Sequence, residues 1–144
     1  MKQLYGLIGY PLTHSFSKVF FNEKFEAENI PAEYRNFEIS DISQFREILV
    51  NYPALRGLNV TLPYKEAIIP FLDELDETAE EVGAVNVIRF IREKGKLILK
   101  GYNSDVTGFS ESISPLLTDE HNHALILGTG GASKAVEYAL CRLG

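Results

Sequence analysis

The spacing of apolar positions along the chain switches repeatedly between a period typical of strands and one typical of helices. Short apolar or alternating runs predict strands over residues 3–9, 32–39 and 56–62. Each run leads into apolar residues at helical spacing, which predicts helices within 15–29, 40–50 and 64–82. Phe16, Val19, Phe20 and Phe25 are expected to form the apolar face of the first helix. Pro70 predicts two short helices in the third segment rather than one.

The second half of the chain begins with two apolar runs separated by a charged turn. Residues 84–102 therefore predict a β-hairpin that turns at Gly95. A helix is predicted from near Val106 to about Pro115, and the polar stretch "TDEHNH" follows it. The apolar run "ALILGTGG" then predicts one more strand, followed by a last helix.

Strands that alternate with helices indicate an α/β fold, with a mixed, mostly parallel sheet that carries helices on both faces. We place a domain boundary near residue 121, so that 1–121 form one domain and 122–144 begin another. A single strand with a single helix cannot cover its own apolar surface. We therefore expect this chain to be the N-terminal part of a longer protein.

Composition excludes several classes of partner. The 144 residues are 45% hydrophobic and 24% charged, as in a soluble globular protein, and the net charge is −6. No cluster of Lys and Arg breaks this acidic balance, so a nucleic-acid partner is not expected. No run approaches the ~20 apolar residues of a membrane span, and no signal peptide is recognisable. With one cysteine, Cys141, which we expect to be a buried thiol, the chain is predicted to be cytoplasmic.

The turn "GTGGAS", Gly128 to Ser133, joins the last predicted strand to the last predicted helix. Small residues at such a turn let the backbone approach a diphosphate at a helix N-terminus, where amide groups and the helix dipole favour negative charge. Glycines that merely allow a tight turn are the simpler alternative. The residue that would read the cofactor ribose falls beyond Gly144, so the type of cofactor is not predicted from this turn.

Two serines and two histidines lie in loops where they could bind ligands. Ser15 and Ser17 precede the first helix, where a hydroxyl either caps the helix or binds a carboxylate oxygen. Local sequence alone favours capping. His121 and His123 have no third ligand at metal spacing, so a solvated loop is favoured over a metal site.

The segment "NVTLPYK" places Lys65 just past the end of a strand, which is the edge where open α/β sheets bind their ligands. A solvated surface lysine is the simpler alternative. Asn59 and Thr61 precede it on one strand face, and Asn86 and Asp105 follow other predicted strand ends. An amine, a carboxylate and several neutral hydrogen-bonding groups would suit acid/base chemistry on a sugar-like alcohol.

Taken together, five motifs resemble those of the shikimate dehydrogenase family, and the similarity spans the whole chain. They occur in the family's order as "GYPLTHSFSKVFFN" from Gly9, "NVTLPYK" from Asn59, "GAVN" from Gly83, "NSD" from Asn103 and "GTGGA" from Gly128. Two positions depart from the first motif, because Lys18 replaces the usual proline and Phe21 the second histidine.

The resemblance implies an NADP-dependent oxidoreductase that interconverts 3-dehydroshikimate and shikimate in aromatic amino acid biosynthesis. Residues 122–144 would begin its Rossmann-type cofactor domain. Lys65 would act as the acid/base and Asp105 as its paired carboxylate. Ser15 and Ser17 would bind the substrate carboxylate, and its hydroxyls would be bound by Asn59, Thr61, Asn86 and Asp105. The cofactor diphosphate would be bound by Gly128, Thr129, Gly130, Gly131 and Ala132. Glu77 would lie near the nicotinamide.

This implication reverses the local preference for helix capping at the two serines. It also leaves two alternatives open, a shikimate-binding module without turnover and a dehydrogenase of the quinate/shikimate type. A homodimer is compatible with the resemblance. Because the cofactor domain would be incomplete, we expect this chain by itself to be inactive.

Overall fold

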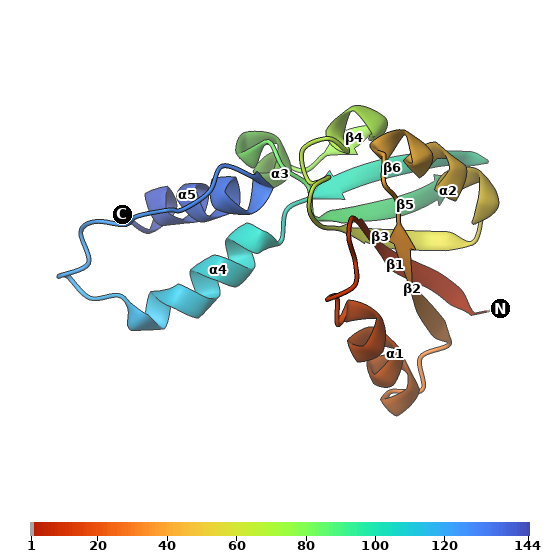
Figure 1. Cartoon of the computed structure of the whole chain (residues 1–144), viewed down its shortest axis with the longest axis horizontal. Coiled ribbons are helices and arrows are strands. Elements are labelled where there is room, and N and C mark those ends of the chain that lie inside the picture. The colour runs from red at the N-terminus through yellow and green to blue at the C-terminus, as the bar shows by residue number, and fades with distance from the viewer. Residues whose placement is uncertain (1) are drawn as a thin grey trace.

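The computed structural model describes residues 2–144, which form one mixed six-stranded sheet with helices packed around it (Figure 1). The strands are β1 (Gln3–Gly9), β2 (Ala32–Glu38), β3 (Leu55–Val60), β4 (Glu74–Leu75), β5 (Val87–Glu93) and β6 (Lys96–Tyr102). The α-helices are α1 (Ser17–Ala27), α2 (Phe45–Asn51), α3 (Glu77–Val82), α4 (Asp105–Ile113) and α5 (Gly131–Leu143). Short 3₁₀ helices are η1 (Ile42–Gln44), η2 (Ile69–Phe71) and η3 (Ser114–Leu116).

The strand order is β2-β1-β3-β5-β6-β4. The directions of the strands bring distant parts of the chain to one edge of the sheet. β1 pairs in parallel with β2 and β3, whereas β5 runs antiparallel to both β3 and β6. The ends of β1, β3 and β6 therefore lie at the same edge as the start of β5. The predicted hairpin is confirmed as β5 and β6. The two-residue strand β4, which pairs in parallel with β6, was not predicted.

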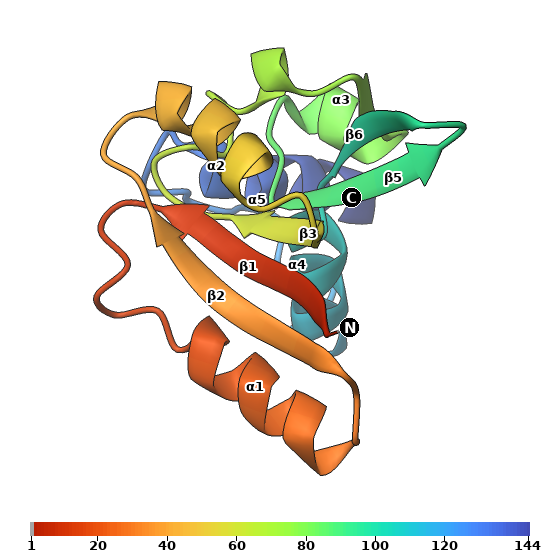
Figure 2. The same cartoon turned by 90° about the vertical axis from the view of Figure 1, so that its right-hand side faces the viewer.

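Helices cover both faces of the sheet, as the sequence predicted (Figure 2). The main core lies on the face covered by α2, where Ile8 of β1 and Leu55 of β3 are fully buried with Phe45 of the helix. On the opposite face, α1 packs over β1 and β2 through a smaller cluster that contains Leu7 and Tyr34. The strands thus alternate their side chains between two apolar layers.

The first helix forms where expected but presents a different face to the sheet. Phe16, Val19 and Phe20 are 72%, 59% and 49% exposed, whereas Phe21 and Phe25 pack against the sheet. Both stripes have helical spacing, so periodicity alone could not choose between them. Side-chain hydrogen bonds from this helix to β2, described below, favour the stripe that contains Phe21.

The strand predicted within 124–131 is absent from the described structure, although the helix after it is present as α5. Leu125 and Leu127 are 85% and 87% exposed, because this run pairs with no other strand and an unpaired strand gains no ladder hydrogen bonds. α5 instead packs on α4 and α3 through Ala135 and Ala139. Cys141 on the same helix is exposed, so the predicted burial of its thiol is wrong.

The turn that carries Lys65 is tied to the core by Tyr64. Its phenol is 6% exposed and donates a 2.7 Å hydrogen bond to the carbonyl of Ile39, just past β2. Within residues 2–144, every helix falls short of the length and apolarity needed to cross a membrane.

Replacing Tyr64 by Phe should therefore lower the free energy of unfolding by about 1 to 3 kcal/mol, because the buried Ile39 carbonyl loses its donor. Urea unfolding followed by circular dichroism measures the change. Tyr10→Phe is the matched control, since Tyr10 is 48% exposed. Equal urea midpoints for the two variants would contradict this role of the phenol.

Candidate active site

Polar side chains gather at the sheet edge where β3 and β6 end and β5 begins. Asn59 lies at the end of β3, and Lys65 lies in the turn that follows it. Asn86 immediately precedes β5, and Asp105 is the first residue of the helix after β6. The antiparallel hairpin therefore brings together residues that are far apart in sequence.

Lys65 and Asp105 form an ion pair, with Nζ and Oδ2 only 2.6 Å apart. The side chains are 13% and 31% exposed, so the amine is largely withdrawn from water while the carboxylate remains accessible. The carbonyl of Lys65 accepts a 2.7 Å hydrogen bond from the backbone N–H of Val85, which fixes the turn against the start of the hairpin. A short charge-assisted bond of this kind holds the amine in one direction.

Asn86 holds the second carboxylate oxygen of Asp105. Its Nδ2 donates to Asp105 Oδ1 over 2.8 Å, and its Oδ1 accepts a 2.8 Å bond from the backbone N–H of Ser104. The Asn86 backbone is itself part of the sheet edge, since its carbonyl accepts from Val60 and its N–H donates to Tyr102. Each oxygen of Asp105 therefore has its own donor, and the carboxylate cannot rotate freely.

Asn103 holds the backbone next to Asp105 in place, although the sequence analysis assigned it no role. It is 5% exposed, and its Nδ2 donates a 2.9 Å bond to the carbonyl of Ala84. Its Oδ1 accepts bonds from the backbone N–H groups of Asp105 and Val106, and so caps the start of α4. An asparagine just before a predicted helix was the available signal, because asparagine is a preferred cap.

Asn59 and Thr61 lie on the β3 side of the same edge. Asn59 Nδ2 approaches the Asn86 carbonyl at 3.5 Å, which connects it loosely to the ion-pair cluster. The backbone N–H of Thr61 donates to Ile8, and its methyl lies over Gly9, where an added Cβ would stand 2.4 Å away. Gly9 therefore lets the loop that leads to the serines leave the sheet beside Thr61.

Ser15 and Ser17 are half-buried in that loop and at the first turn of α1. The helix begins after Phe16, and its start has no side-chain cap. Within residues 2–144, neither serine hydroxyl has a hydrogen-bond partner. The capping role that local sequence favoured is therefore not adopted, and both hydroxyls remain available to a ligand.

The glycine turn lies next to Lys65 rather than apart from it. Gly131, the first residue of α5, is buried, and an added Cβ would stand 2.8 Å from Lys65 Cβ and 3.1 Å from Ala84 Cβ. An ion pair of 2.5 Å between Lys134 and Glu66 fastens the same helix to the turn. The start of α5 is thus packed directly against the residue that carries the amine.

The backbone of the glycine turn is accessible just before α5. Gly128 has a positive φ of 136°, and a Cβ at Gly130 would meet no atom within 4 Å, so the backbone before α5 is open to a ligand. Thr129 and Ala132 are exposed beside it. Free backbone N–H groups at the start of a 13-residue helix favour a bound anion.

Glu77 lies exposed in the first turn of α3, outside the group of side chains that surrounds Asp105.

The chain is similar to known proteins over nearly its whole length. The family described as the shikimate dehydrogenase substrate binding domain matches residues 7–88. The curated shikimate dehydrogenase (NADP(+)) of Aquifex aeolicus (strain VF5) is 44% identical over 145 residues, which cover 99% of this chain and 52% of that protein. The chain therefore spans about half the length of this relative.

Solved structures give the same result. The crystal structure of shikimate dehydrogenase from Aquifex aeolicus superposes with a TM-score of 0.84 at 42% identity, over 99% of this chain and 53% of that one. Shikimate 5-dehydrogenase from Thermus thermophilus, solved in complex with NADP(H) and shikimate, superposes with a TM-score of 0.82 at 31% identity, over 99% and 53%. Since the family match covers more than half of the chain, the chain belongs to the shikimate dehydrogenase substrate-binding domain family.

Proposed function

We propose that this chain is the substrate-binding and catalytic part of an NADP-dependent oxidoreductase that interconverts 3-dehydroshikimate and shikimate. The observation that carries the proposal is the Lys65–Asp105 ion pair, held by Asn86 at the sheet edge. Residues 1–121 form the substrate domain in this proposal, and 122–144 begin the cofactor domain. By itself the chain binds substrate weakly and does not turn it over.

The substrate lies across the edge, with its carboxylate towards the α1 loop and its hydroxyls towards the ion-pair cluster. Ser15 and Ser17 supply hydroxyl donors to the carboxylate, close to the N-terminus of α1. Asn59, Thr61 and Asn86 offer amide and hydroxyl groups to the ring hydroxyls. Because the chain has a net charge of −6, its overall field does not attract an anion, and an anionic substrate must be held by local hydrogen-bond donors such as these.

Lys65 moves the proton in this mechanism. When the substrate carbonyl is reduced, negative charge develops on its oxygen, and the protonated Nζ of Lys65 donates to that oxygen. In the opposite direction the neutral amine accepts the hydroxyl proton. Asp105 aims the amine through the 2.6 Å contact, and the packing of Gly131 on the lysine stem limits the other directions it could take.

The glycine turn would hold the diphosphate of the cofactor through Gly128, Gly130 and the backbone that opens α5. A bound nicotinamide cofactor would supply the hydride. The curated relative from Aquifex aeolicus is named for NADP(+), which supports NADP over NAD.

Lys65→Ala should abolish turnover with little loss of shikimate affinity, in a protein that joins this chain to a complete cofactor-binding half. Loss of the proton donor should lower kcat by about 10²- to 10⁴-fold. Absorbance of reduced nicotinamide measures the rate. Lys100→Ala is the control, because the amine of Lys100 pairs with Glu74 on the β4 edge of the sheet. A Lys65→Ala enzyme with near-normal kcat would refute this role.

The double substitution of Ser15 and Ser17 by Ala should weaken shikimate binding to this chain by about tenfold or more, because two hydrogen bonds to a charged group are lost. The methyl ester of shikimate, which lacks that charge, should lose much less. Chemical-shift titration measures both affinities, with Ser43→Ala in η1 as the control. Equal losses for acid and ester would show that the serines do not bind the carboxylate.

A further inference from the structure

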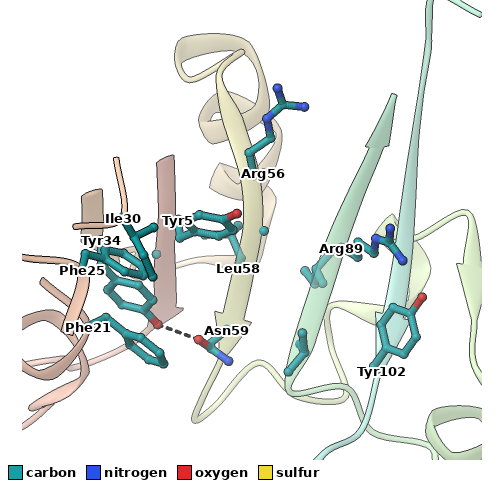
Figure 3. A pocket seen from close by; sticks show the side chains of 14 residues that line it. Tyr5, Phe21, Phe25, Ile30, Tyr34, Arg56, Leu58, Asn59, Arg89 and Tyr102 are labelled. Atoms are coloured by element: carbon teal, nitrogen blue, oxygen red, sulfur yellow. Dashed lines mark hydrogen bonds between the residues drawn. The ribbon is translucent and has the colours of Figure 1, made fainter. Parts of the chain in front are cut away.

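The α1 face of the sheet contains a mostly apolar pocket of about 500 Å³, and Tyr34 lines it beside Asn59 (Figure 3). Tyr34 is 3% exposed, yet its phenol has a polar partner. The hydroxyl lies 2.7 Å from Oδ1 of Asn59, at the end of β3. A residue of the apolar layer is thus hydrogen-bonded to a residue that we place in the substrate site.

Two contacts agree on the orientation of the Asn59 amide. The Tyr34 hydroxyl donates to Oδ1, and Nδ2 points in the other direction, towards the Asn86 carbonyl at 3.5 Å. If the amide were rotated by half a turn, its oxygen would face that carbonyl oxygen, which is unfavourable. The contact to Asn86 is at the long limit of a hydrogen bond, so Nδ2 keeps donor capacity for a ligand.

Tyr34 is itself held firmly, which a positioning group requires. Its ring stacks on Phe21 with centroids 4.7 Å apart and an interplanar angle of 18°. The side chain of Asn22 in α1 bonds both the N–H and the carbonyl of Tyr34, each over 2.9 Å. Burial raises the pKa of Tyr34 above its usual value, so the phenol keeps its proton and remains a donor.

Asn22 belongs to the first motif of the sequence but has no part in the chemistry described above. Its two bonds to Tyr34 attach α1 to β2, and α1 begins at Ser17. The helix that carries the carboxylate-binding serine is therefore connected through Tyr34 to the amide of Asn59. The hydrogen bonds of Asn22 and Tyr34 therefore link the serine side of the proposed substrate site to the Asn59 side.

We propose that Tyr34 is a positioning residue that fixes the Asn59 amide with Nδ2 turned towards the substrate. The site then presents a donor at this position and selects a ligand group that accepts a hydrogen bond, such as a ring hydroxyl oxygen. The selection of a hydroxyl rests on the proposed function, whereas the fixed orientation of the amide does not.

Tyr34→Phe tests this role because it removes the hydroxyl and keeps the ring that stacks on Phe21. In the unliganded chain, nuclear magnetic resonance should show the Asn59 side-chain amide becoming more mobile, with a lower order parameter, while the buried amide of Asn103 is unchanged. Tyr5→Phe is the matched control, since Tyr5 lines the same pocket but its hydroxyl donates to Gln3, two residues away and outside the substrate site. An Asn59 amide equally ordered in all three proteins would overturn the proposal.

A double-mutant cycle with shikimate separates positioning from a general structural effect. Tyr34→Phe should weaken binding by about 3- to 10-fold when Asn59 is present, and have little effect when Asn59 is replaced by Ala. Equal losses in both backgrounds would overturn the positioning role. If the unaltered chain shows no shikimate binding, the proposed function fails, while the order parameter of the Asn59 amide still decides the role of Tyr34.

Discussion

The carboxylate of Asp105 is the interaction on which the site depends. One oxygen pairs with Lys65 and the other accepts from Asn86, so three separate segments of the chain meet on a single group. A largely buried amine without such a partner would be costly to keep charged. The β5–β6 hairpin makes the meeting possible, because it both begins and ends at the edge where β3 ends. The buried amide of Asn103 then fixes the start of α4, and with it the direction of the carboxylate.

The two faces of the sheet contribute differently to this edge. The face covered by α2 supplies a continuous apolar core that fixes the strands. The α1 face is smaller and more aromatic, and it contains the hydrogen bonds through Asn22 and Tyr34 that reach Asn59. The larger apolar core thus lies on one side of the sheet, where Tyr64 holds the turn of Lys65. The amide of Asn59 is oriented from the other side.

Periodicity predicted most strands and helices, because their apolar spacing is a local property of the sequence. It could not choose the buried face of α1, where the bonds of Asn22 to β2 decide between two stripes. It also predicted a strand around Leu125 that does not form, since a strand requires neighbours that local spacing does not describe. The meeting of Lys65 with Asp105, forty residues apart, was likewise not derivable from local pattern. Their positions after predicted strand ends suggested a common site, and the family resemblance then assigned them as a pair. Tyr34 belongs to none of the family's motifs.

The contact between Gly131 and Lys65 has a mechanical consequence. At Gly131, α5 contacts the side chain of Lys65 so closely that even an added methyl group would stand 2.8 Å from Lys65 Cβ. The helix therefore has no room to move closer to the lysine. The start of α5 therefore acts as a one-sided stop. It can move away from the lysine, but it cannot press closer without displacing the amine from its carboxylate. The contact at Gly131 therefore limits motion of α5 towards the lysine, whereas it does not limit motion away from it.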